Sequence, residues 1–180
     1  MRVKGFGVDG CREGWFWVGL GEEEPEYGVV SILEELLEKH QSAATIFIDI
    51  PIGLPWSGLR ERSCDREARK VLAPPRSSSV FPVPSRAAVY ARDYVDAGQL
   101  NRQHLGKGLP RQSWAIAPKI REVDELVRQR PKLRDWVREC HPEVCFWALA
   151  GKTMKDMGYK NVSNVGGFAA WKDAGGPVED

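Results

Sequence analysis

The sequence predicts an α/β domain built on a mixed β-sheet, and three features support this prediction. Short apolar segments of strand-like composition occur at residues 3–8, 15–20, 27–30 and 45–50. The first ends at Asp9-Gly10, and the linker 11–14 before the second is short enough for an antiparallel hairpin. A helix-like segment precedes the fourth, so that strand can return parallel to the first.

The helices are predicted from apolar spacing and from end signals. Ser31 is expected to cap a helix over 32–40, with Glu34 three residues later. A second helix is expected over 59–72 and should end at Pro74-Pro75. The remaining expected elements are a loop at 76–84, helices at 85–95, 116–128 and 142–150, glycine-rich chain at 106–108, and a short strand at 137–141.

Composition indicates an ordinary soluble globular protein. The chain has 180 residues, of which 42% are hydrophobic and 28% are charged. No apolar run approaches the ~20 residues that span a bilayer, and the start resembles no signal peptide. The four cysteines form no CxxC pair, which argues against a zinc site. We therefore expect a cytoplasmic protein with reduced thiols and no membrane partner.

Charge is unevenly distributed along the chain. Residues 1–59 carry 4 basic and 10 acidic side chains, residues 60–138 carry 18 and 9, and residues 139–180 carry 4 and 6. A basic middle flanked by acidic ends suggests an anionic partner for that middle. Solvated, arginine-rich helices would explain the same pattern.

Two otherwise apolar strands each carry one aspartate near the carboxyl end, Asp9 in Gly7-Val8-Asp9-Gly10 and Asp49 in Ile48-Asp49-Ile50-Pro51. If these strands are parallel neighbours, both carboxylates lie at the sheet edge where ligands gather in α/β folds. Like charges repel there, and a divalent cation would relieve the repulsion. Ligands that are all oxygen favour Mg²⁺ or Mn²⁺. Turn capping by either aspartate is the alternative.

Several motifs, taken in order, are similar to domain-of-unknown-function family 429, a family of predicted nucleases with a ribonuclease H-like fold. The matching stretches are 7–15, 48–55, 64–69, 79–86, 106–110, 112–124 and His141-Pro142-Glu143. The resemblance extends over residues 1 to about 150, and its specificity lies in the number and order of the motifs.

This resemblance implies a sheet of order 3-2-1-4-5 with flanking helices and a helical insertion. It implies that Asp9 and Asp49 on adjacent strands are catalytic metal ligands, holding the two ions of a site that hydrolyses phosphodiester bonds in nucleic acid. Glu143, just after the fifth strand, is the candidate for a further ligand. A first-turn residue favoured by the helix dipole is the alternative for Glu143.

Basic residues within these motifs are candidates for contacts with the phosphates of nucleic acid or of another phosphate-bearing ligand. They are Arg76, Arg86, Lys107, Arg111 and Lys119.

Residues 152–180 are similar to the end of a rhodanese domain, which predicts a first domain at 1–151 and a rhodanese-like tail at 152–180. The cysteine loop of a rhodanese is missing, and Cys145 is the nearest thiol. The change of resemblance near residue 151 also replaces the C-terminal helix from which ribonuclease H-like domains usually supply a final acidic residue. Two alternatives to a nuclease therefore stay open: a non-catalytic module binding nucleic acid or phosphate, and a sulfurtransferase.

Overall fold

The structure is a computed structural model that describes residues 5–22, 24–40, 45–56, 58 and 61–156. The chain divides into two compact units. The first comprises residues 1–60 and 83–140, and the second comprises residues 61–82 and 141–180.

The first unit is built on a five-stranded sheet of order β3-β2-β1-β4-β5. The strands are β1 (Gly5–Cys11), β2 (Gly14–Leu20), β3 (Glu26–Val30), β4 (Ile46–Ile48) and β5 (Val137–Glu139). β2 pairs antiparallel with β1 and β3, whereas β4 pairs parallel with β1 and β5. The predicted mixed sheet and its order are confirmed.

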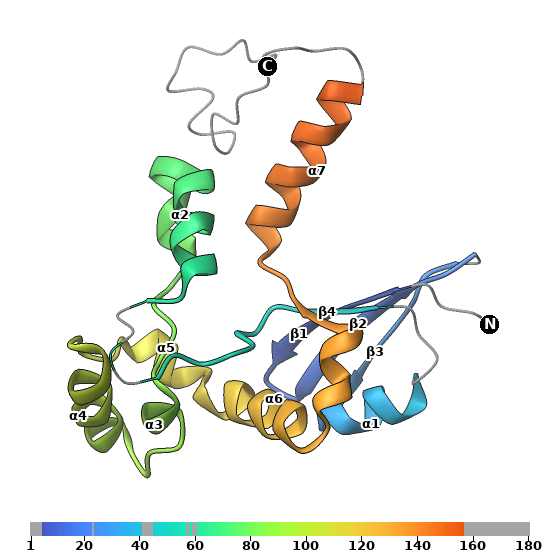
Figure 1. Cartoon of the computed structure of the whole chain (residues 1–180). Coiled ribbons are helices and arrows are strands. Elements are labelled where there is room, and N and C mark those ends of the chain that lie inside the picture. The colour runs from blue at the N-terminus through green and yellow to red at the C-terminus, as the bar shows by residue number, and fades with distance from the viewer. Residues whose placement is uncertain (1–4, 23, 41–44, 57, 59–60, 157–180) are drawn as a thin grey trace. The chain divides into compact units, whose positions relative to one another are not determined.

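The apolar alternation of the strands places one face of the sheet in the core. Phe6, Val8, Trp15, Ile46 and Ile48 all point to this face and are buried. Helices α1 (Leu33–Lys39) and α6 (Ala117–Gln129) lie along it (Figure 1). Large side chains on the opposite face are substantially exposed; they are Phe16, Leu20, Tyr27, Val29 and Phe47.

The N-terminus of α1 is capped from another element. Ile32, not Ser31, precedes the helix, and it makes no side-chain cap. Instead, the Leu33 N–H donates to Glu122 Oε1 on α6 at 2.5 Å. The prediction that Ser31 caps this helix is wrong, because a carboxylate distant in sequence supplies the acceptor that the first turn needs.

The chain between β4 and β5 forms more and shorter helices than the sequence predicts. The expected helix 85–95 is two elements, α3 (Arg86–Val89) and the start of α4 (Tyr94–Leu105). Asp93 begins α4, accepting the Asp96 N–H at 2.9 Å, and Gly106 ends it in a left-handed conformation. α5 (Arg111–Ala115) then leads into α6, which lies within one residue of its predicted range.

The second unit contains α2 (Ser63–Arg76), a short 3-10 helix (Ser77–Ser79) and α7 (Pro142–Asp156). The prediction that Pro74-Pro75 ends α2 is wrong, since the helix continues to Arg76. The prolines fall in its last turn, so the bonds that they cannot donate are lost only at the end of the helix and no further turn is disrupted. No helix in the described ranges is long and apolar enough to cross a membrane.

The β1–β2 hairpin depends on glycine at position 14. Gly14 has φ +143°, and a β-carbon there would lie 2.1 Å from the Val30 carbonyl oxygen. We expect Gly14→Ala to lower the free energy of unfolding by about 3 kcal/mol or more. Chemical denaturation would measure the change. Gly7→Ala is the matched control, because a β-carbon at Gly7 meets nothing within 4 Å. Equal losses in the two variants would contradict this account.

Candidate functional site

The carboxyl ends of β1 and β4 bring Asp9 and Asp49 side by side. Val8 pairs with Ile48 in the parallel ladder; Asp9 follows Val8 within β1, and Asp49 is the first residue after β4. The Asp49 N–H donates to the Val8 carbonyl at 3.1 Å and continues the ladder by one bond. This pairing and the Asp49–Val8 bond place the two aspartates at the same end of neighbouring parallel strands.

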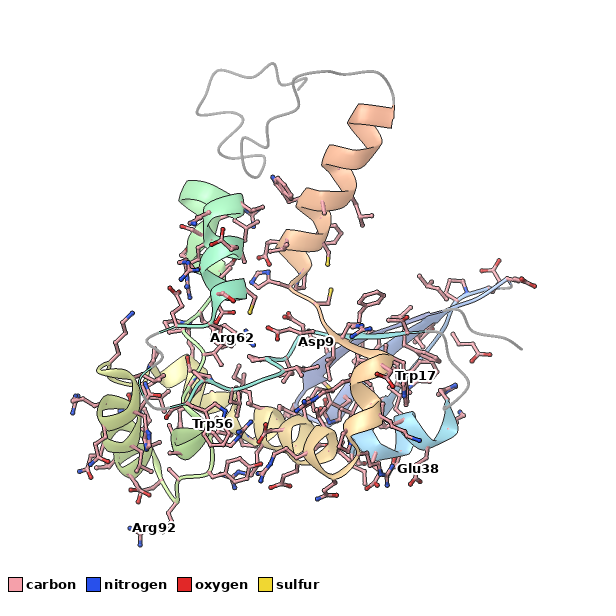
Figure 2. All side chains as sticks on the ribbon, viewed as in Figure 1. Asp9, Trp17, Glu38, Trp56, Arg62 and Arg92 are labelled. Carbon is pink, nitrogen blue, oxygen red and sulfur yellow. The ribbon has the colours of Figure 1, made fainter. Side chains whose placement is uncertain are left out.

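Both aspartates are exposed on the face opposite α1 and α6. Asp9 is also held by the hairpin, where it pairs with Phe16, and it lies at this edge in Figure 2. Asp9 on β1 and Asp49 directly after β4 thus place two exposed acidic side chains at the same end of the sheet. Such a pair attracts cations, and its oxygen donors suit hard divalent ions.

A third acidic residue at this edge, Glu139, is one that sequence reasoning missed. It ends β5 and pairs with Ile48. Its Oε2 accepts the Ile52 N–H at 2.7 Å. The sequence signal was a lone acid at the end of a three-residue strand, which is too short for a clear alternation pattern.

Lys119 on α6 reaches the end of β1 from the packed face. It is half-buried, and a β-carbon at Gly10 would lie 3.5 Å from its Cγ. Its Nζ lies 4.5 Å from the centroid of the Trp15 ring. The structure therefore brings one of the predicted basic residues to the strand that carries Asp9.

Two other predicted basic residues of this unit are exposed on helices and loops. Arg111 lies over the Tyr94 ring, with 4.9 Å between its Cζ and the ring centroid. Lys107 is in the loop after α4. The buried Asn101 side chain holds this loop. The Asn101 side chain donates to the Lys107 carbonyl at 3.0 Å and accepts the Ser85 N–H at 2.8 Å.

Arg86 is committed to a buried carboxylate. Its Nε and Nη2 donate to the two oxygens of Asp124 at 3.0 and 2.9 Å, and the Tyr90 hydroxyl donates to the same carboxylate at 3.1 Å. Burial, together with the nearby Asp124 charge, raises the pKa of Tyr90. This bidentate pair explains why the position needs an arginine, whether or not Arg86 also meets a phosphate.

Glu143 and Arg76 belong to the second unit. Glu143 lies in the first turn of α7, and its Oε2 is 3.1 Å from Nδ1 of His141. The other ring nitrogen of His141 lies 3.3 Å from the Ser79 carbonyl oxygen. Arg76 ends α2 and is exposed. His141 thus connects the start of α7 to the Ser79 loop within this unit.

The described residues contain no group of three or more histidine, cysteine, aspartate or glutamate side chains arranged to hold a metal ion. Asp9 and Asp49 therefore form a candidate metal site of two carboxylates.

Cys145, the thiol nearest the rhodanese-like segment, lies within α7. Its N–H makes a regular helical bond to the His141 carbonyl at 3.0 Å. A thiol in this setting is not surrounded by a glycine-rich loop of free N–H groups, which is what would stabilise a persulfide anion.

Comparison with known proteins identifies the family. The family described as protein of unknown function DUF429 matches residues 7–170, so the chain belongs to this family. No curated protein and no solved structure matches the chain. The match continues beyond residue 151, where the first domain was expected to end. The rhodanese-like interpretation of residues 152–180 stays a prediction; residues 157–180 lie outside the described part of the chain.

The Arg86–Asp124 pair gives a test of what this arginine does. Its side chains are 19% and 6% exposed, so Arg86→Ala would leave a buried carboxylate without its cation. We expect the free energy of unfolding to fall by about 3 kcal/mol. Arg92→Ala is the control, because the Arg92 side chain is 88% exposed and should contribute little. An Arg86→Ala protein as stable as wild type would contradict the structural role.

Proposed function

We propose that this protein hydrolyses phosphodiester bonds in nucleic acid with the help of divalent cations held by Asp9 and Asp49. The observation that supports the proposal most directly is the placement of these two exposed acidic side chains at the carboxyl ends of adjacent parallel strands, directly after the paired residues Val8 and Ile48. The edge beyond the carboxyl ends of such strands is where α/β sheets bind ligands.

The donor set fits magnesium or manganese. Mg²⁺ is commonly bound by one or two carboxylates, with water and substrate phosphate completing its coordination. Asp9 and Asp49 supply the two carboxylates, and their exposure leaves room for the other ligands. When bound, such ions supply an activated water and offset the charge that develops on the phosphate. Glu143 as a further ligand is part of the proposal that rests on the family resemblance alone.

The chain's own residues have separate roles in this proposal. Asp9 and Asp49 bind the cations and fix their position on the sheet edge. Lys119, held against Gly10 and the Trp15 ring, offers a positive charge to the phosphate backbone. The exposed Arg111 and Lys107 add positive charge on the helical part of the same unit. Contacts of this kind position a polyanion without reading its sequence.

A module that binds nucleic acid or another phosphate-bearing ligand without cleaving it shares these features and differs only in turnover. The sulfurtransferase alternative receives no support from the helical surroundings of Cys145.

The proposal predicts a cation site that depends on both aspartates. Titration calorimetry should detect Mn²⁺ binding to the wild-type chain, and Asp9→Asn/Asp49→Asn should weaken it by more than about 100-fold because the ligand oxygens lose their charge. The matched control is Glu13→Gln/Glu24→Gln, which removes the same charge from two exposed positions elsewhere.

Hydrolysis of bis(4-nitrophenyl) phosphate and of single- and double-stranded DNA and RNA would then be compared with and without Mn²⁺. Cleavage that persists in Asp9→Asn would exclude the proposed site. Mn²⁺ binding and nucleic-acid binding without any cleavage would favour the non-catalytic module.

The role of Lys119 predicts a change in salt dependence. Lys119→Met keeps the stem that packs on Gly10 but removes the charge. If Lys119 contacts a phosphate, the slope of log affinity for nucleic acid against log salt should decrease by about 1 between roughly 50 and 200 mM salt. Fluorescence anisotropy measures the slope, and Arg92→Met is the control of equal charge change. A slope equal to that of wild type would exclude the contact.

A further inference from the structure

The segment that carries Asp49 leaves the sheet immediately after β4, and its path depends on a small number of anchors. Ile48 is the last strand residue, and its carbonyl accepts the Cys140 N–H at 2.9 Å. The Asp49 N–H donates to Val8 on the other side. Ile50 and Pro51 follow and are buried, and proline has no N–H to donate.

The first backbone donor after Pro51 is the Ile52 N–H, and a side chain accepts it. β5 ends at Glu139, so the fifth strand offers no ladder residue opposite Ile52. The Glu139 carboxylate accepts this N–H at 2.7 Å, a short distance typical of a charge-assisted bond. The bond ties the chain three residues beyond Asp49 to the end of the neighbouring strand.

Glu139 and Asp49 are on opposite faces of the sheet. Glu139 is paired with Ile48, and registered side chains of parallel strands share a face. Ile48 points to the buried face, whereas Asp49, the next residue, alternates to the exposed face. The register therefore places Glu139 away from the oxygens of Asp9 and Asp49 rather than beside them as a third ligand.

We propose that Glu139 is a positioning residue: by holding the Ile52 N–H, its carboxylate fixes the segment 49–52 and thereby the direction in which Asp49 presents its oxygens to a divalent cation. This inference rests on the proposed function for its metal, but the hydrogen bond acts on the protein without metal as well. Groups that orient metal ligands typically affect metal affinity by about 10- to 100-fold.

The test compares Glu139→Gln with Glu139→Ala in the full chain. The glutamine oxygen can still accept the Ile52 N–H, whereas alanine cannot. In metal-free protein, we expect the Ile52 amide to exchange with solvent at least about 10-fold faster in Glu139→Ala than in wild type, and close to the wild-type rate in Glu139→Gln. Glu13→Ala is the control for loss of an exposed glutamate.

Mn²⁺ titration of the same variants gives the second readout. Glu139→Ala should weaken Mn²⁺ binding by about 10-fold or more, and Glu139→Gln should restore most of it. Equal weakening by both variants would show that Glu139 is a ligand and overturn the inference. Unchanged Ile52 exchange in Glu139→Ala would overturn it as well. If wild type binds no Mn²⁺, the proposed function fails, and the exchange rates still decide whether Glu139 holds the segment.

Discussion

One carboxylate oxygen of Glu122 joins three elements of the first unit. It accepts the indole N–H of Trp15 on β2 at 2.9 Å and the Leu33 N–H at the start of α1. Both donors would otherwise be unsatisfied in or beside the core, where that loss is costly. Because Lys119 is one helical turn before Glu122 on α6, the same docking places its side chain over Trp15 and against Gly10.

The edge of the sheet is defined by where each strand stops pairing. β1 continues through Asp9 because the hairpin extends the ladder to Cys11 and Gly14. β4 stops at Ile48, so Asp49 is the first residue of an irregular segment and keeps one backbone bond to Val8. Asp9 therefore sits within a paired strand, whereas Asp49 lies in a segment that is held by the bonds of residues 48–52. Because β4 ends at Ile48, the hydrogen bond from the Ile52 N–H to Glu139 anchors the segment that follows Asp49.

Much of the first unit is predictable from local pattern. Apolar segments and the short 11–14 connection indicate the hairpin, and two apolar strands carry Asp9 and Asp49 near their carboxyl ends. The adjacency of these two strands was implied by the family resemblance. Local signals failed where a distant group or a second signal intervened. The α1 N-terminus is capped by Glu122 and not by Ser31. A separate helix, α4, begins after Asp93 inside the expected helix 85–95.

The sequence by itself determined which segments form strands, that the first two can pair as a hairpin, and that Asp9 and Asp49 fall at the ends of apolar strands. These features follow from side-chain periodicity and from turn residues, which act over a few positions of the chain; the strand order came from the family resemblance. Only the tertiary structure decided which face each carboxylate takes and which partner it meets. Glu122 and Glu139 bond to groups 89 and 87 residues away, and no local pattern encodes a hydrogen bond formed between elements that packing alone brings together.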